Sequence, residues 1–238
     1  MFVRRNDLTL YDRLSSTWWE PRGTFNQLID FNPLRISFFE GVVGDFRDKS
    51  ILDIGCGGGI LTEEFAKRGG RVTGIDSSYR SLYHAKVHAR ESAFEIDYRL
   101  GNASALPFPD NAFDILVASE VLEHIGNLNL TLWEMVRVLK PDGFLLFDTP
   151  NRSWFSWLYF IAFGEMLSRR IPRGTHDFRM FIRPKELILK LQALGVQVKD
   201  IRGYSYYGRG ADGRHQFRFS RSPAVAYFGS GTKGRWPG

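Results

Sequence analysis

The feature that most limits what this chain can fold into is a glycine run directly behind an apolar segment. Residues 51–76 read ILDIGCGGGILTEEFAKRGGRVTGID, with four glycines among the five residues 55–59. An apolar run before the glycines and an amphipathic segment behind them predict a strand, a bare loop and a helix. Further strand-like and helix-like segments alternate behind it. The pattern predicts a doubly wound α/β fold with a mostly parallel sheet.

The expected organisation is one domain over residues 1–238, built on a seven-stranded sheet. Pro33 is expected to interrupt the helical lead-in, and residues 229–238 are expected to be frayed. Core strands are expected at 50–55, 71–76, 96–102, 113–119 and 144–150, and helices at 60–69, 79–92 and 128–140. The parts are a helical lead-in (1–49), a cofactor-binding core (50–151), an aromatic insert (152–183) and a C-terminal part of the sheet with the tail (184–238).

Charge and cysteine content narrow the class of protein. Cys56 is the single cysteine, which excludes an intramolecular disulfide and a cysteine-based metal site. The net charge of +6 suits an acidic partner, but the arginines are scattered and no RNA-binding motif is present, so nucleic acid is an unlikely partner. A secretory signal and a membrane-spanning apolar run are both missing from the sequence, which predicts a cytoplasmic location.

The spacing of the glycines indicates the kind of ligand. A dinucleotide-binding loop of the form G-x-G-x-x-G would need a glycine where Ile60 stands. The run instead has the form D-x-G-x-G-x-G, beginning at Asp53 and including Gly55 and Gly57. Asp76 ends the second expected strand, where a carboxylate can accept both hydroxyls of a ribose. Capping of a loop by Asp53 or of a helix by Asp76 remains open as an alternative.

This glycine loop with its two acids resembles that of the class I S-adenosylmethionine-dependent methyltransferases, which have a Rossmann-like fold. The resemblance implies that Asp53 lies near the methionine amino group and that Gly55 and Gly57 line the methionine and ribose. Many relatives carry aspartate where Asn102 stands, at the place that receives the adenine amino group. Asn102 retains an acceptor oxygen but not the charge.

A second group of polar residues follows the fourth expected strand, in the segment SEVLEHI (119–125). If this segment is helical, Glu120 and His124 share a face, with Glu123 close by. Such a group would hold a divalent cation that activates a phenol, or would supply a general base without metal. In a third interpretation His124 only packs.

Three further stretches narrow the family: STWWEPRGTFNQLIDFNPLRISFF (16–39), PRGTHDFRMFIRPKEL (172–187) and SEVLEHI itself. Together they resemble the ubiquinone-biosynthesis O-methyltransferases, the demethylubiquinone 3-O-methyltransferase family. The resemblance implies that Arg35, Gly55, Asp76 and Ser119 bind the cofactor. It also matches Glu120, Glu123 and His124 to a triplet proposed to bind Mg²⁺. Residues 203–221, GYSYYGRGADGRHQFRFSR, have no clear match and are expected to shape the acceptor pocket.

The family resemblance predicts methylation of a phenolic, catechol-like quinone precursor with a polyprenyl tail. Two alternatives stay open: methylation of a soluble phenol or amine, and a non-catalytic role in a membrane-docked assembly. The aromatic run RSWFSWLYFIAFGEMLSRRIPRG (152–174) is too short to span a bilayer but suits an interfacial helix. We therefore expect peripheral contact with an anionic membrane surface through 152–173, at the inner face of the membrane. A buried insert that covers the active site is the alternative.

Overall fold

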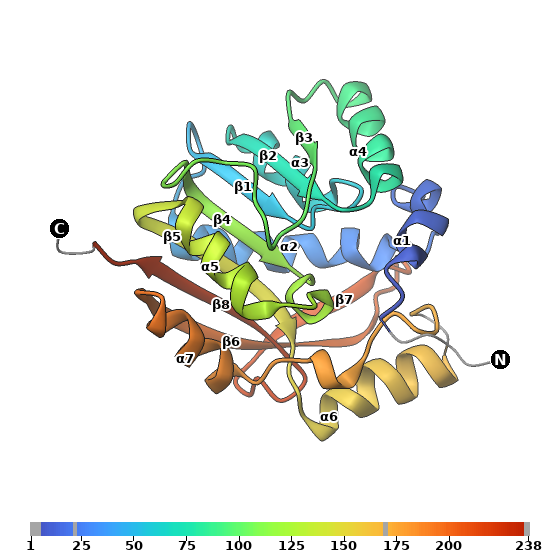
Figure 1. Cartoon of the computed structure of the whole chain (residues 1–238). Coiled ribbons are helices and arrows are strands. Elements are labelled where there is room, and N and C mark those ends of the chain that lie inside the picture. Colours follow the sequence, from blue (N-terminus) through green and yellow to red (C-terminus); the bar gives the residue numbers. More distant parts are fainter. Residues whose placement is uncertain (1–5, 21–22, 169–170, 236–238) are drawn as a thin grey trace.

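One mixed sheet of eight strands runs through the computed structural model, which describes residues 6–20, 23–168 and 171–235 (Figure 1). The strands lie in the order β3-β2-β1-β4-β5-β8-β6-β7. The first five of these are mutually parallel, whereas β8 is antiparallel to both of its neighbours and β7 is antiparallel to β6. The strands are β1 (Ser50–Ile54), β2 (Arg71–Asp76), β3 (Asp97–Leu100), β4 (Phe113–Ser119), β5 (Leu139–Pro150), β6 (Val196–Arg209), β7 (His215–Ser220) and β8 (Ala226–Lys233).

Helices cover both faces of the sheet, with α2 behind it and α5 and α7 in front in Figure 1. The helices are α1 (Thr9–Arg13), α2 (Asn26–Val43), α3 (Ile60–Lys67), α4 (Tyr79–Glu91), α5 (Leu128–Val138), α6 (Trp154–Ser156) and α7 (Pro184–Ala193), with the 3-10 helices η1 (Ser15–Thr17), η2 (Leu122–His124) and η4 (Phe178–Met180) and the π-helix η3 (Trp157–Leu167). Leu52 of β1 packs in the core on the α5 and α7 side, and Ile51 packs on the α2 and α3 side. Burial on both faces explains the largely apolar composition of the central strands β1 and β4.

The sheet has eight strands and not the expected seven. The additional strand β7 lies within 203–221 and forms an antiparallel hairpin with β6. Its aromatic residues Phe217 and Phe219 alternate with arginine and glutamine, which is a strand pattern, and the two rings pack against Phe31 and Phe38 of α2. The glycines and arginines of the stretch conceal this short alternation.

Two local predictions were also wrong. Pro33 lies inside α2 and does not interrupt it. The buried aromatic face of that helix, with Phe38 and Phe39, offsets the roughly 3 kcal/mol that an interior proline costs. Of the segment 229–238 expected to be frayed, residues 229–233 supply the second half of β8, where Ser230 is fully buried between β5 and β6, and residues 236–238 lie outside the described residues.

Among the described residues, no helix combines the length and the apolar character needed to cross a bilayer. The aromatic insert folds instead into α6 and η3, which follow each other directly in the chain and form one continuous helix at one end of the molecule (Figure 1).

Candidate active site

A cavity of about 610 Å³ opens at the carboxyl ends of the parallel strands. Its volume is that of a small-molecule site, and its position is where open α/β sheets bind ligands. All seven residues expected to bind a cofactor line this one cavity: Arg35, Asp53, Gly55, Gly57, Asp76, Asn102 and Ser119. Glu120 and His124 line it as well, so one cavity holds both groups of predicted functional residues.

The glycine loop between β1 and α3 leaves no room for side chains. Gly55 has a φ of 69°, and a Cβ there would lie 2.4 Å from the side chain of Val121. Gly57 has a φ of 54°, and a Cβ there would lie 2.5 Å from the ring of Trp18. Both positions therefore need glycine for conformation and for space. The N-terminal lead-in thus packs directly on the loop that forms the floor of the cavity.

Asp53, at the end of β1, is buried, and its Oδ2 accepts a hydrogen bond of 2.7 Å from the Thr62 hydroxyl. Burial raises the pKa of Asp53 to about 7, although the Thr62 hydrogen bond and the charge of Arg35 act in the opposite direction. A ligand ammonium group beside this carboxyl would favour its charged form.

Asp76, at the end of β2, holds the glycine loop in place. Its Oδ2 accepts from the Gly57 N–H at 2.9 Å, and its Oδ1 accepts from the Ser78 N–H at 2.7 Å. Ser78, rather than Asp76, is the N-cap of α4, so the helix-cap alternative does not hold for Asp76. Since each carboxylate oxygen accepts more than one hydrogen bond, Asp76 retains acceptor capacity toward the cavity that it lines.

Arg35 of α2 brings a positive charge into the cavity wall. Its side chain is 4% exposed, its Nε lies 3.9 Å from Asp148 Oδ2, and its guanidinium lies 4.3 Å from the centre of the Phe31 ring. Ser119 donates a hydrogen bond of 2.6 Å to the same Asp148 oxygen. Arg35 Nε has no hydrogen-bond partner, so this buried donor can still bind a carboxylate.

Asn102 lines the cavity where β3 ends. Its Oδ1 accepts a hydrogen bond of 2.8 Å from the Ser104 N–H, which fixes the amide. One lone pair of that oxygen remains for a donor such as an adenine amino group.

The segment after β4 is not an α-helix, so Glu120 and His124 do not share a helical face. Glu120 precedes the 3-10 helix η2 and has a φ of 52°, a left-handed conformation that is strained for glutamate. Its Oε1 accepts a hydrogen bond from the Tyr204 hydroxyl of β6. Glu120 is therefore held by β6 through Tyr204.

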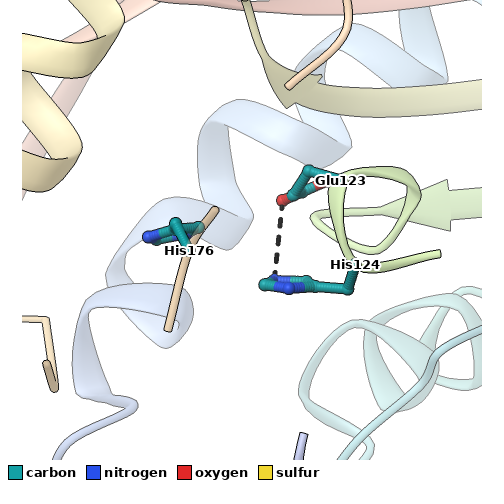
Figure 2. A group of neighbouring side chains, drawn as sticks. All are labelled: Glu123, His124 and His176. Atoms are coloured by element: carbon teal, nitrogen blue, oxygen red, sulfur yellow. Dashed lines mark ion pairs between the residues drawn. The ribbon is translucent and has the colours of Figure 1, made fainter. Parts of the chain in front are cut away.

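The residues that could hold a metal ion are Glu123, His124 and His176, whose ligand atoms lie within 4.8 Å of one another (Figure 2). Glu123 Oε1 is buried, has no hydrogen-bond partner and lies 4.0 Å from His124 Nε2. His176 Nδ1 lies 2.9 Å from Glu165 Oε1, so the other ring nitrogen remains for a ligand, as in many metal-binding histidines. Glu165 belongs to η3, and the aromatic insert thus orients one member of the group.

The protonation of His124 suits a ligand role, whereas Glu123 would have to lose the proton that its raised pKa favours, as a bound cation would promote. Burial, and next the charge of Glu120, raise the pKa of Glu123. Burial and the neighbouring His176 lower the pKa of His124 to about 3, so its ring is neutral near pH 7. A neutral imidazole is the form that binds metals.

Comparison with known proteins identifies the family of the chain. Residues 52–147 match the methyltransferase domain family. The ubiquinone biosynthesis O-methyltransferase of Nitrosomonas europaea is 37% identical over 201 residues, covering 84% of this chain and 86% of the relative. The protein of the same name from Pseudomonas fluorescens is 39% identical over 206 residues, covering 86% of this chain and 88% of the relative. The chain belongs to the ubiquinone biosynthesis O-methyltransferase family.

Solved structures agree on the fold. A SAM-dependent methyltransferase from Aquifex aeolicus superposes with a TM-score of 0.62 at 14% identity, covering 93% of this chain and 97% of that one. The predictions of a Rossmann-like α/β fold and of an S-adenosylmethionine-dependent O-methyltransferase are thereby confirmed. The ubiquinone biosynthesis O-methyltransferase family implies S-adenosylmethionine as the cofactor of this chain.

The donor set does not favour the Mg²⁺ expected for this family member. Mg²⁺ prefers oxygen ligands in octahedral geometry, whereas the group here offers two imidazoles and one carboxylate. Imidazole-rich sites suit divalent transition metals such as Zn²⁺ or Fe²⁺. The residues present therefore fit a transition-metal ion better than magnesium.

Three residues of the site were not assigned a role from the sequence: Asp148, His176 and Tyr204. Asp148 lies at the carboxyl end of β5, and that position is itself a signal for a site residue in a parallel sheet. His176 stands in the GTHD stretch that marks the family, but only the fold brings it beside Glu123. Tyr204 lies in the stretch 203–221 that was expected to shape the acceptor pocket, but nothing in the sequence distinguishes it from its neighbours.

Proposed function

We propose that this methyltransferase transfers the methyl group of S-adenosylmethionine to a phenolic oxygen of a catechol-like quinone precursor that carries a polyprenyl tail. The observation that carries the proposal is the single cavity lined by the cofactor residues, Glu120 and His124. The names of the relatives from Nitrosomonas and Pseudomonas support the acceptor class.

Methyl transfer requires that the phenolic acceptor be positioned against the methyl group and that it lose one proton. The phenolic oxygen attacks the methyl carbon in line with the C–S bond, which breaks and leaves S-adenosylhomocysteine. Arg35 and Asp53 would bind the two ends of the methionine group, and Asp76 would bind the ribose. Glu120, at the cavity surface, would accept the proton of the acceptor. A divalent ion held by Glu123, His124 and His176 would lower the pKa of a coordinated phenol when it is bound.

The proposal is tested with purified protein, methyl-labelled S-adenosylmethionine and a short-tailed demethylubiquinol. Assays after chelation are compared with assays after addition of Mg²⁺ or Zn²⁺. We expect label on the ring oxygen, with a larger recovery of activity by Zn²⁺ than by Mg²⁺. Tight cofactor binding without label would contradict the acceptor, and a screen of soluble phenols and amines would then precede any non-catalytic assignment.

We also propose that the segment 152–173 contacts an anionic membrane surface at the inner face of the membrane. One side of α6 and η3 is exposed, with Trp154 and Phe155 more than 60% exposed and further apolar residues beside them: Leu158, Phe163, Met166 and Leu167. The other side is buried, and Phe160 lines the active-site cavity. The segment thus combines a surface suited to lipid with a cover for the site. Arg169 and Arg170 lie outside the described residues.

Removal of two exposed rings should weaken membrane binding. The double variant Trp154→Ala/Phe155→Ala is expected to bind vesicles of anionic phospholipid about thirtyfold more weakly, since each ring contributes on the order of 1 kcal/mol at the interface. Sedimentation with vesicles measures this. Trp133→Ala, which removes an exposed tryptophan of α5, is the matched control. Equal binding by the double variant and the control would contradict the proposed surface.

A further inference from the structure

A second cavity, of about 60 Å³, adjoins the active-site cavity. The two share Gln27, Leu28, Glu120, Phe160 and Ile171 in their walls, so the smaller cavity directly adjoins the larger one and is called the branch below. Glu120 lies at the junction of the two. A ligand that fills the main cavity beside Glu120 can therefore extend a group into the branch.

The wall of this side cavity is aromatic and comes largely from the β6–β7 hairpin. Tyr204 and Tyr206 of β6 and Phe217 of β7 line it, together with Phe31 of α2 and Tyr159 of η3. The Phe31 ring centre lies 4.7 Å from those of both Tyr204 and Phe217, and the Tyr206 and Phe217 centres are 5.6 Å apart. These ring contacts hold the wall in place and make it suited to an apolar group.

The hydroxyl of Tyr204 does not disturb this character. It is committed to Glu120 Oε1, at the mouth of the cavity. The wall also includes Gln27 and Ser205, so its apolar surface comes from the aromatic rings and not from every residue that lines it. An acceptor with one polar end and one apolar end fits this arrangement in one orientation, with the reacting oxygen at Glu120 and the apolar end in the branch.

We infer that the side cavity receives the apolar ring substituent of the phenolic acceptor, and that the β6–β7 hairpin determines which substituents the enzyme accepts. This inference rests on the proposed function. A water-sized group occupies about 10–15 Å³, so the cavity holds roughly five such groups, about one five-carbon prenyl unit. The hairpin lies in the stretch 203–221, which has no clear match in the pattern of the family, so this chain's preference can differ from that of its relatives.

The test changes the volume of the cavity without touching the residues that bind cofactor or take the proton. Phe217→Trp fills the cavity and Phe217→Ala enlarges it. The matched control is Phe219→Trp, two residues along the same strand, because Phe219 packs on Phe38 and Phe228 and lines neither cavity. The measured quantity is kcat/KM for two catechols that differ only in a prenyl group on the ring.

We expect Phe217→Trp to lower kcat/KM for the prenylated catechol at least tenfold, and to leave that for the unsubstituted catechol within about twofold. Phe217→Ala should favour a bulkier ring substituent. Phe219→Trp should leave the ratio of kcat/KM for the prenylated and unsubstituted catechols unchanged. A thermal melt of each variant confirms folding. The inference would be overturned if Phe217→Trp lowered kcat/KM equally for both catechols, or if Phe219→Trp changed the ratio of the two kcat/KM values as much as Phe217→Trp does. Either result would leave the proposed function standing. Failure of the unmodified enzyme to methylate either catechol would overturn the proposed function and the inference with it.

Discussion

Replacement of Arg35 by methionine is expected to weaken S-adenosylmethionine binding by about 10- to 100-fold, the value of one charge-assisted hydrogen bond. The side chain of Arg35 is buried and its Nε has no hydrogen-bond partner, so it can bind the methionine carboxylate. The same substitution should lower the free energy of unfolding by about 1–3 kcal/mol, because Asp148 would lose the guanidinium that favours its charged form. Burial already raises the pKa of Asp148 to about 8, so its carboxyl would be neutral at pH 7 in the variant. Calorimetric titration and denaturant unfolding measure the two effects.

The double variant Arg35→Met/Asp148→Asn separates binding from folding. It removes both charges, and we expect it to recover most of the lost stability while cofactor binding stays weak. Arg35→Lys keeps the charge but not the forked geometry, and should be intermediate in affinity. Near-normal cofactor affinity in the double variant would show that Arg35 serves only as the structural partner of Asp148.

The parts of this molecule that the sequence predicts best depend on neighbours along the chain. Asp53 and Gly57 are four residues apart in one loop, and Asp76 ends the next strand, so their convergence follows from two adjacent βα units. The central strands β1 and β4 are buried on both faces, and their largely apolar composition reveals them directly. Contacts between distant segments are not needed to predict these positions.

The parts that sequence reasoning missed depend on contacts between distant segments. Tyr204 bonds to Glu120 across 84 positions of sequence, and His176 meets Glu123 only because Glu165 of the insert holds its ring. Local periodicity carries no information on such pairs. The fold was therefore needed to bring Tyr204 and His176 into the site, whereas Glu120 and His124, like the cofactor residues, were predicted from the sequence.

The distinct positions of the two glutamates lead to the second prediction of large effect. Glu120→Gln is expected to lower kcat by about 10²- to 10⁴-fold, the usual contribution of a general base, while the Kd for S-adenosylmethionine changes less than threefold. Glutamine keeps the shape of the side chain and the acceptor oxygen for Tyr204 but cannot take a proton. Single-turnover transfer of the labelled methyl group, together with cofactor titration, measures both quantities.

The choice of Glu120 over Glu123 as the base rests on access. Glu120 lines both cavities, whereas Glu123 lines neither and is 1% exposed. An acceptor in the main cavity can reach the carboxylate of Glu120 but not that of Glu123. Glu123→Gln should therefore lower activity through the group that could hold a metal ion, and the activity of this variant should respond to added Zn²⁺. Tyr204→Phe, which removes only the hydroxyl bonded to Glu120, should lower kcat by less than Glu120→Gln. If Glu120→Gln kept full turnover while Glu123→Gln lost it, deprotonation would belong to the group of Glu123, His124 and His176, and Glu120 would only separate the two cavities.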